Sequence, residues 1–250
     1  IPEFSTYYEP FLGGGAVLFA LQPNQAVVND QNEELINMYK VIRDNVEELI
    51  YHLSQHKNEK DYFYRIRELD RNKKAYSKLS NVERAARIIY LNKTCYNGLF
   101  RVNRAGQFNT PFGNYKNPKI VDEVTLKAVS RYLSNADVKI LNCDFEEAVE
   151  DIEKGDFVYF DPPYDPVSDT ASFTGYDKGG FGKSEQIRLK KVCDRLNARG
   201  IKFLLSNSAT EFILDLYKDY NITFVKARRA INSVPEKRGE IDEVLVMNYD

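Results

Sequence analysis

Short apolar runs alternate with stretches of helical periodicity along much of the chain. Runs rich in β-branched and aromatic residues, each bounded by turn residues, occupy residues 5–9, 26–30, 138–144, 156–161, 201–207, 222–227 and 243–249. Several are continuously apolar, which is typical of strands covered on both faces. Apolar positions recur at helical spacing over residues 33–53, 82–92, 184–198 and 210–217. The alternation of strands and helices predicts an α/β fold with an open sheet.

The alternation stops between the strands predicted at 26–30 and 138–144. Helices rich in Lys and Arg, and loops rich in Gly, Asn and Pro, fill this interval. A chain of 250 residues with 43% hydrophobic content can bury one sizeable core and is short for two ordinary domains. We therefore predict one α/β domain over residues 1–55 and 136–250, with residues 56–135 inserted into it.

The net charge of −2 conceals a strong asymmetry along the sequence. Residues 60–119 contain fourteen Lys or Arg and four Asp or Glu, a net charge of +10, so the remainder carries −12. Solvated helix faces explain such charge on a single helix, but a basic segment of this length favours a surface that binds nucleic acid.

The cysteines and the hydropathy exclude several classes of protein. Cys95, Cys143 and Cys193 are scattered singly, which argues against a disulfide framework or a zinc site. His52 and His56, the only histidines, lie four residues apart on a helical stretch, where a place on the helix surface is favoured over a metal-binding pair. We therefore expect no metal site and no histidine-based triad. No apolar run approaches the length of a membrane span, and the first residues do not resemble a signal peptide. We expect a cytoplasmic protein that does not bind membranes.

A glycine motif follows the first predicted strand. Residues 9–17 read EPFLGGGAV, a strand end that enters a glycine turn and then a helix. Glycines let the backbone approach a ligand closely, and a helix N-terminus offers unpaired N–H groups. Asp30 and Asp144 end the next two strands, where an acid can bind ribose hydroxyls. The alternative for each acid is a helix N-cap.

The sequence Asp161-Pro162-Pro163-Tyr164 follows the apolar strand at 157–160. Two successive prolines give a rigid turn without N–H donors, so the Asp161 carboxylate and the Pro162 carbonyl form a fixed cluster of acceptors. Each can accept one hydrogen of adenine's amino group, which directs the nitrogen lone pair toward a methyl donor. Tyr164 supplies a ring on which an unstacked base can lie. The alternative is a turn with an exposed tyrosine.

These motifs, in this order, resemble the Dam-type DNA adenine methyltransferases, the α group of amino-methyltransferases. The chain looks most like the GATC-modifying members of bacterial restriction–modification systems. The resemblance covers nearly the whole chain through EPFLGGGAV, VVND, CYNGLFRVN (95–103), FNTPFG (108–113), NPK (117–119), CDF (143–145), DPPY and LSNS (205–208). It implies a Rossmann-like methyltransferase with a mixed, mostly parallel sheet and an inserted helical and hairpin domain for DNA recognition.

The resemblance also implies roles for individual residues. The cofactor S-adenosyl-L-methionine would be bound by Glu9, Pro10, Phe11, Gly13, Gly15, Asp30, Asp144, Phe145 and Asp161. The catalytic residues would be Asp161, Pro162 and Tyr164, acting on an adenine N6 flipped out of double-stranded DNA. Arg101 would read a base edge, and the other DNA contacts would come from Tyr96, Asn97, Leu99, Asn103, Pro111, Asn114 and Lys116. A cognate restriction endonuclease that acts on the same site is the expected partner of a monomeric enzyme.

The sequence departs from the family pattern at two places. Family members normally carry an upstream segment of the form K-W-x-G-G-K, which closes over the methionine end of the cofactor, and we expect the given sequence to start after the position of that segment. Asn114 stands where many members have Arg after the Pro-Phe-Gly of the hairpin, which removes one contact to phosphate or base.

Other functions compete with DNA adenine methylation. The first residue of the DPPY motif favours adenine over N4-cytosine or protein glutamine, whereas RNA adenine remains an alternative substrate. A DNA-binding module without activity and a nicotinamide-dependent oxidoreductase are alternatives from other classes. For the glycine-rich loop at 174–183, closure over a flipped base competes with an ordinary loop. For the basic loop around 232–235, phosphate binding competes with a plain surface role.

Overall fold

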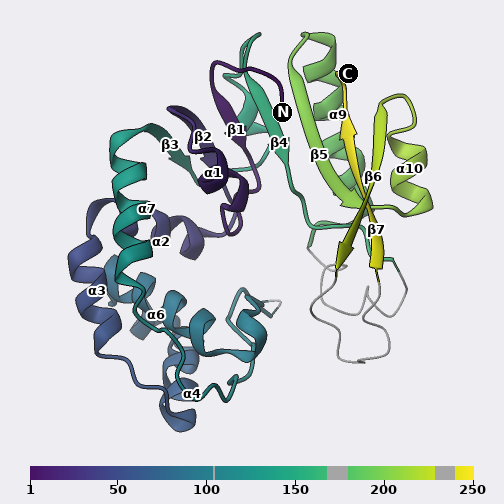
Figure 1. Ribbon diagram of the computed structural model, residues 1–250. Helices are drawn as coiled ribbons and strands as arrows, with labels where there is room; N and C mark the ends of the chain where they lie inside the picture. The colour runs from purple at the N-terminus through teal and green to yellow at the C-terminus, as the bar shows by residue number, and fades with distance from the viewer. Residues whose placement is uncertain (104, 168–179, 229–239) are drawn as a thin grey trace. The chain divides into compact units, whose positions relative to one another are not determined.

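The computed structural model describes residues 1–103, 105–167, 180–228 and 240–250, and it divides the chain into two compact units (Figure 1). The first unit comprises residues 1–31 and 143–250, and the second comprises residues 32–142. Most of the loop at 174–183 and the basic loop around 232–235 lie outside the described residues. The second unit takes in residues 32–55 and 136–142, which the sequence assigned to the α/β domain, and the functional division into domains stays a prediction.

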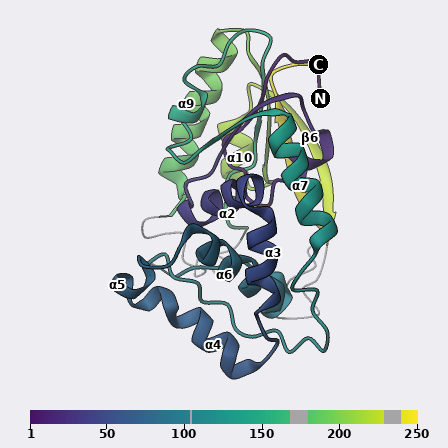
Figure 2. The ribbon, with the colours of Figure 1, turned by 90° about the vertical axis from the view of Figure 1, so that its left-hand side faces the viewer.

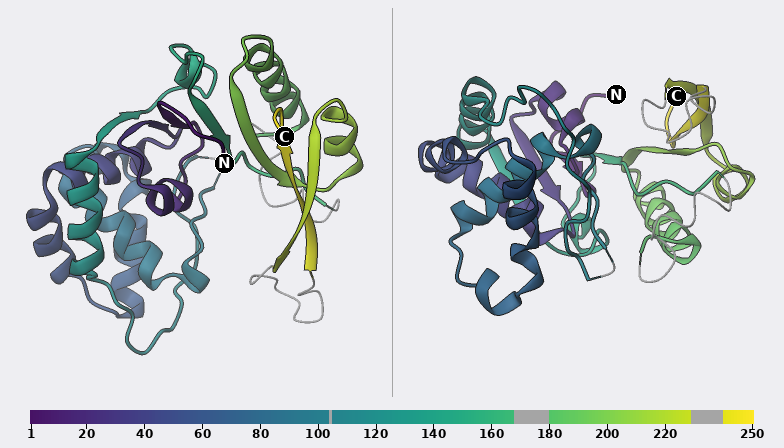
Figure 3. Two further views of the ribbon diagram at one scale, coloured as in Figure 1. Left: turned by 45° about the horizontal axis from the view of Figure 1, so that its top comes forward. Right: turned by 90° about the horizontal axis from the view of Figure 1, so that it is seen from below.

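The first unit is built on a mixed sheet with the strand order β2-β1-β4-β5-β7-β6. Its strands are β1 (Tyr7–Glu9), β2 (Gln25–Asn29), β4 (Phe157–Phe160), β5 (Lys202–Ser208), β6 (Asn221–Arg228) and β7 (Glu240–Met247). The strands β2, β1, β4 and β5 are parallel, whereas β7 lies between β5 and β6 and is antiparallel to both (Figure 3). The predicted mixed, mostly parallel sheet is confirmed.

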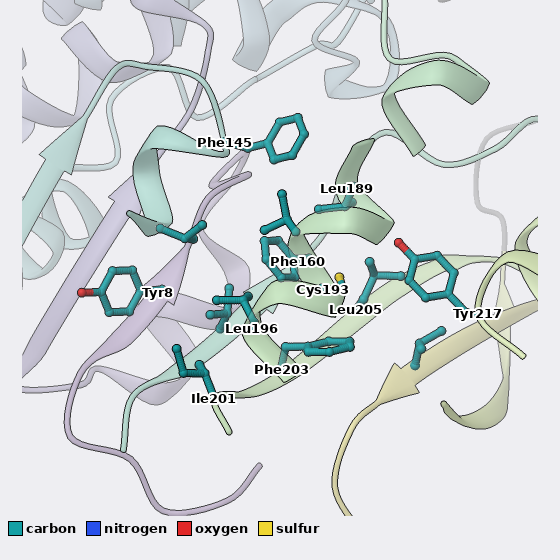
Figure 4. Close-up of a cluster of buried hydrophobic side chains, with 14 of the residues drawn as sticks. Tyr8, Phe145, Phe160, Leu189, Cys193, Leu196, Ile201, Phe203, Leu205 and Tyr217 are labelled. Carbon is teal, nitrogen blue, oxygen red and sulfur yellow. The ribbon is translucent and has the colours of Figure 1, made fainter. Parts of the chain in front are cut away.

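The helices of the first unit are α1 (Ala16–Leu21), η3 (Glu147–Val149), α9 (Lys183–Ala198) and α10 (Glu211–Leu216). The buried positions of α9 are Gln186, Leu189, Val192, Cys193 and Leu196, a stripe with helical spacing. Figure 4 shows Leu189, Cys193 and Leu196 beside Phe203 and Leu205 of β5, within one cluster of buried side chains. β4 contributes Phe157, Val158 and Phe160, all fully buried, as expected for a strand covered on both faces. The core therefore fixes the end of β4, where the DPPY sequence begins.

The second unit is mainly helical. Its elements are α2 (Glu33–Asp44), α3 (Val46–Ser54), α4 (Lys60–Glu68), η1 (Leu69–Arg71), α5 (Lys73–Tyr76), α6 (Asn81–Thr94), η2 (Tyr96–Gly98), α7 (Glu123–Asn135) and β3 (Asp137–Leu141). The helices α2, α3, α6 and α7 pack on one another in pairs (Figure 2). The predicted helix over 33–53 is two helices, because Asn45 has φ −138° and ψ 38°, outside the helical region. No helix in the described part of the chain is long and apolar enough to cross a bilayer.

A buried ion pair joins α6 to the segment that follows α4. The Arg87 side chain is 3% exposed and lies 2.8 Å from the Asp70 carboxylate. It also donates hydrogen bonds to the carbonyl oxygens of Ile66 and Arg67, both at 2.8 Å. Asp70 in turn accepts the Phe108 N–H at 2.9 Å. Because a buried charge is costly unless it is paired and hydrogen-bonded, this network holds the backbone of Phe108 on the segment that follows α4.

Candidate active site

The glycine turn after β1 is hydrogen-bonded to a carboxylate from the end of β2. Gly13 and Gly15 have φ of 47° and 66°, in the left-handed region that favours glycine. The Gly13 N–H donates to the Asp30 carboxylate at 3.0 Å. A Cβ built on Gly13 or Gly14 would meet no atom within 4 Å. The turn therefore borders open space, as a backbone that binds a ligand closely requires.

Asp30 does not act as a helix cap. The N-cap of α2 is Asn32, whose side chain accepts the N–H groups of Glu34 and Leu35. The capping alternative for Asp30 is therefore wrong, and its carboxylate is bound to the glycine turn.

Asn29 ties this turn to a distant segment. It is 1% exposed, and its side-chain amide donates to the carbonyl oxygens of Pro10 at 3.0 Å and Cys143 at 3.1 Å. Its side-chain oxygen accepts the Cys143 N–H at 2.9 Å. One amide thus joins the residues after β1 to the residues that precede Asp144. The sequence offered one signal for this role, a polar residue at the end of an apolar strand.

Glu9 is a buried carboxylate at the end of β1. It is 2% exposed and accepts the Tyr7 hydroxyl hydrogen at 2.8 Å. Burial raises the pKa of Glu9, hydrogen bonds from the Tyr7 hydroxyl and the Leu18 N–H lower it, and the nearby Asp161 charge raises it, so that the pKa lies at about 7. Two acids therefore lie close together at the carboxyl ends of β1 and β4, an arrangement that favours a cationic ligand.

Aromatic side chains line the same end of the sheet. The Phe11 ring lies 5.2 Å from the Phe145 ring and 5.3 Å from the Phe181 ring, measured between centroids. The Arg188 guanidinium of α9 lies 4.2 Å from the centroid of the Phe145 ring. The predicted residues Phe11 and Phe145 are thus in contact, and Phe181 is an aromatic neighbour that the sequence did not indicate.

Asp144 has two structural partners. One carboxylate oxygen accepts the Glu146 N–H at 2.9 Å, and the other pairs with Arg188. The first bond is the capping type of contact that the sequence left open for Asp144.

Asp161 follows β4 directly and is held by β5. The Ser206 hydroxyl donates to the Asp161 carboxylate at 2.7 Å and lies 3.2 Å from the Tyr159 hydroxyl. Asp161 is exposed whereas Pro162 is buried, so the carboxylate points to solvent from a rigid support. Burial raises the pKa of Tyr164, so its hydroxyl stays protonated. The structure therefore brings Glu9, Asp161 and Tyr164 together at one end of the sheet.

In the second unit, residues 95–113 form the predicted hairpin. Asn97 and Gly98 have φ of 54° and 61°, in the left-handed region, so this Asn-Gly pair forms a tight turn before Arg101. Cys95 pairs with Phe112, and Val102 pairs with Phe108, both in antiparallel bridges. Arg101 is exposed, and its Nε donates to the side-chain oxygen of Asn109 at 2.8 Å. Its Nη2 donates to the carbonyl oxygen of Asn109 at 3.3 Å, so the two bonds hold one edge of the guanidinium and set its direction.

The other predicted DNA-binding residues divide into exposed and structural ones. Tyr96, Asn97, Pro111, Asn114 and Lys116 are exposed. The Leu99 carbonyl accepts the Thr110 hydroxyl at 2.6 Å, and the Asn103 side chain accepts the Ala105 and Gln107 N–H groups. The structure therefore gives Leu99 and Asn103 a part in shaping the hairpin.

Comparison with protein-family models gives a match over residues 1–231, to the D12 class N6 adenine-specific DNA methyltransferases. The chain belongs to this family. The type II methyltransferase M1.LlaDCHI of Lactococcus lactis subsp. cremoris is 46% identical over 252 residues, 100% of the chain and 88% of the relative. The type II methyltransferase M.MjaIII of Methanocaldococcus jannaschii is 47% identical over 258 residues, 97% of the chain and 88% of the relative. The DNA adenine methylase of Salmonella typhi is 30% identical over 252 residues, 99% of the chain and 87% of the relative.

Several basic residues of the methyltransferase's positive segment have internal partners. Arg67 and Arg71 donate to the carbonyl oxygens of Thr110 at 3.4 Å and Phe108 at 2.7 Å, and Arg84 pairs with Glu33 and Glu34. These arginines, with the buried Arg87, hold the hairpin and helices in place. The exposed basic residues in the described part of this segment are Lys60, Arg65, Lys73, Lys74, Lys78, Lys93, Arg101, Lys116 and Lys119.

Packing accounts for His56 of the methyltransferase. His56 lies beyond the end of α3, stacks on Tyr90 with centroids 4.3 Å apart, and contacts the Tyr62 hydroxyl at 2.9 Å. Burial lowers its pKa to about 4, so His56 is neutral at pH 7. His56 is therefore a packed residue of the second unit and not the surface-helix residue that the sequence suggested.

Replacing Glu9 by glutamine should stabilise the fold at high pH. An acid whose pKa rises from 4.5 to about 7 on folding costs stability as the pH increases through that interval, and the cost is constant above it. The glutamine keeps an acceptor for the Tyr7 hydroxyl and carries no charge. We expect Glu9→Gln to gain about 1–3 kcal/mol at pH 8 and to lose this advantage as the pH falls to 4.5.

Urea unfolding of the Glu9→Gln and wild-type proteins at several pH values measures this difference. Glu3→Gln, at an exposed position, serves as the control and should change little. A gain of the same size at pH 5 and pH 8 would contradict the titration of Glu9.

Proposed function

We propose that the methyltransferase transfers a methyl group from S-adenosyl-L-methionine to the N6 amino group of adenine within GATC in double-stranded DNA. The observation that carries the proposal is the cluster at the ends of β1 and β4, where buried Glu9 and exposed Asp161 influence each other electrostatically beside the glycine turn. The family match supports the reaction, and the resemblance in the hairpin supports the target sequence.

The residues of the first unit fit the proposed cofactor. S-adenosylmethionine supplies an electrophilic methyl group and carries positive charge on its sulfonium and ammonium groups. The carboxylates of Glu9 and Asp161 complement that charge, and the open space at Gly13 and Gly14 leaves room for a ligand against the backbone. Asp30 and the rings of Phe11 and Phe145 complete the set of contacts proposed for the nucleoside part of the cofactor.

The DPPY turn supplies the proposed chemistry on the target base. The Asp161 carboxylate and the Pro162 carbonyl each accept a hydrogen from the adenine amino group, which orients the nitrogen lone pair toward the methyl group. The Tyr164 ring stacks on the base, which has to leave the duplex to reach the turn. As the methyl group transfers, the amino group loses a proton, and the Asp161 carboxylate is the acceptor placed to receive it.

Arg101 is the proposed reader of a guanine in the target site. Its guanidinium is exposed and directed by Asn109, and an arginine fork matches the two major-groove acceptors of guanine. A bidentate contact of this kind contributes about 1–3 kcal/mol of discrimination between bases. Because Asn109 already binds one edge of the guanidinium, we expect Arg101→Ala to lose about 1–2 kcal/mol of discrimination at one guanine.

Competitive binding of duplexes with single substitutions in GATC measures the discrimination. The matched control is Lys73→Ala, an exposed cation of the same segment, which should weaken binding to every duplex alike and reduce its salt dependence. An Arg101→Ala enzyme with unchanged discrimination would exclude Arg101 as the reader.

Methylation mapping tests the target sequence itself. DNA treated with the enzyme and S-adenosylmethionine should carry N6-methyladenine at GATC and become resistant to a GATC endonuclease that methylation blocks. Because two relatives are named type II methyltransferases, we further propose that a restriction endonuclease of the same specificity is the functional partner. Adenine marks outside GATC would overturn the assignment of the site.

A further inference from the structure

The backbone on both sides of Tyr164 is held by two buried side-chain amides. The Gln186 amide of α9 donates to the Pro163 carbonyl oxygen at 2.9 Å. The Asn207 side-chain oxygen of β5 accepts the Asp165 N–H at 3.0 Å. The two amides are joined to each other, because Asn207 Nδ2 donates to Gln186 Oε1 at 3.1 Å. The pair therefore closes a chain of hydrogen bonds around the second half of the DPPY turn.

The direction of this chain is fixed at both of its ends. The Pro163 carbonyl only accepts, so Gln186 has to present its NH₂ group there and its oxygen to Asn207. The Asp165 N–H only donates, so Asn207 has to present its oxygen there and its NH₂ group to Gln186. An amide carries one donor group and one acceptor group on a planar head, and both ends of the chain require that combination.

Burial makes these bonds costly to lose. Gln186 is 1% exposed and Asn207 is 0% exposed. Gln186 occupies the same buried stripe of α9 as Leu189, Cys193 and Leu196, where an apolar side chain would pack without any need for partners. A polar residue in such a place costs free energy unless it is fully hydrogen-bonded.

Two successive residues of β5 hold the two ends of the turn. Ser206 donates to the Asp161 carboxylate at 2.7 Å, and Asn207 accepts the N–H of Asp165. Successive side chains of a strand point to opposite faces of the sheet, so Ser206 and Asn207 bind the turn from opposite faces of β5. Thr210 adds a hydrogen bond to the Asp165 carboxylate at 2.7 Å.

We propose that Gln186 and Asn207 are positioning residues for methyl transfer. By holding Pro163 and Asp165, they fix the main chain of Tyr164 and the preceding Pro162 carbonyl relative to Asp161, which Ser206 holds independently. The proposal rests on the proposed role of the DPPY turn. The amide pair should affect the rate of the chemical step and not the binding of the cofactor. A displaced Pro162 carbonyl disturbs the alignment of the amino group with the methyl group but leaves the cofactor pocket intact.

The first test replaces Gln186 by methionine, which keeps the length of the side chain and removes both polar groups. We expect the single-turnover rate of methyl transfer to fall about 10- to 100-fold. The Kd for S-adenosylmethionine and the KM for DNA should stay within about threefold of wild type. Val192→Ala is the control on the same helix, because Val192 is 1% exposed and its loss weakens the core without touching the turn.

The control separates positioning from general destabilisation. If both variants unfold at lower temperature but only Gln186→Met is slow in single turnover at a temperature where both are folded, the proposal stands. If the two variants have equal rates, the amide pair only holds α9 to β5 and the proposal is wrong.

A second variant supplies a pH signature and covers the case in which Gln186→Met does not fold. In Gln186→Glu, a protonated carboxyl group can donate to the Pro163 carbonyl and accept from Asn207, whereas the ionised group cannot donate. Burial raises the pKa of such a carboxyl group, so its protonation falls within the range of assay. The single-turnover rate relative to wild type should therefore rise as the pH is lowered from about 8 to about 6. A ratio that is constant across this range would overturn the proposal.

Asp161→Ala, measured in the same assay, distinguishes failure of this inference from failure of the proposed function. If the Asp161→Ala enzyme is active, the proposed catalytic role of the DPPY turn is wrong. An inactive Asp161→Ala enzyme together with a fully active Gln186→Met enzyme removes only the role of the amide pair.

Discussion

Asp161→Ala should abolish methyl transfer while binding of DNA and cofactor survives. The carboxylate is exposed at the end of β4, where Ser206 holds it at 2.7 Å, and its proposed partner is an amino group that becomes reactive only as its proton is drawn away. Loss of a group that acts in the transition state should cost several kcal/mol, so we expect the rate to fall at least about 100-fold. The measurement is incorporation of tritiated methyl groups into DNA under single-turnover conditions.

Asp151→Ala is a matched control for the Asp161 variant, since Asp151 is also an exposed aspartate of the first unit. It should retain the wild-type rate. Incorporation by Asp161→Ala above about a tenth of the wild-type rate would show that the carboxylate is not essential to the chemical step.

Asp30→Ala should weaken binding of S-adenosylmethionine by about one to two orders of magnitude. Its carboxylate accepts the Gly13 N–H at 3.0 Å, so its removal deletes a proposed contact to the ribose and also loosens the glycine turn. A charge-assisted pair of hydrogen bonds accounts for an effect of this size. Isothermal titration with the cofactor measures it.

The variant Asp30→Asn separates the two contributions. An asparagine oxygen still accepts the Gly13 N–H but carries no charge, so the turn is kept while the charge-assisted bond is lost. We expect an intermediate affinity. An unchanged Kd in Asp30→Ala would mean that Asp30 only supports the turn.

The predicted strands lie where the apolar runs placed them, because continuous burial leaves a local pattern. Phe157, Val158 and Phe160 are all fully buried and read as one apolar run. The position of β7 between β5 and β6 left no such pattern, because strand order depends on contacts between distant segments. The break at Asn45 was missed because the apolar spacing of α2 continues in register into α3.

The residues of the candidate site could be predicted where they belong to a local sequence motif. They could not be predicted where their role depends on a partner that is distant in sequence. The resemblance named Asp161, Pro162 and Tyr164 for catalysis and Glu9 and Asp30 for the cofactor, and these roles stay predictions. The supports of the site, Asn29, Gln186 and Asn207, bind backbone groups far away in sequence. Each leaves only a weak signal, a polar residue within a buried strand or helix stripe, and that signal does not reveal the partner.

Charge along the sequence overstated the basic surface of the second unit. A count of arginines cannot distinguish Arg87, whose side chain is 3% exposed and paired with Asp70, from the exposed Arg101. Internal pairing matters for salt dependence, because only cations that meet phosphate release counterions. The salt slope of DNA binding should follow the exposed basic residues rather than the net charge of +10 over residues 60–119.

The bonds of Asn29 impose an order on biosynthesis. Its side-chain amide can bind Cys143 only after a further 114 residues have been synthesised. β1 can pair with β4 only after Phe157 has been synthesised. All of residues 32–142 leave the ribosome before these partners do, so the second unit can fold while the glycine turn still lacks its support. A nascent chain released before residue 143 would carry the hairpin with Arg101 and no assembled glycine turn, and the two units should differ accordingly in when they become protected from proteolysis during synthesis.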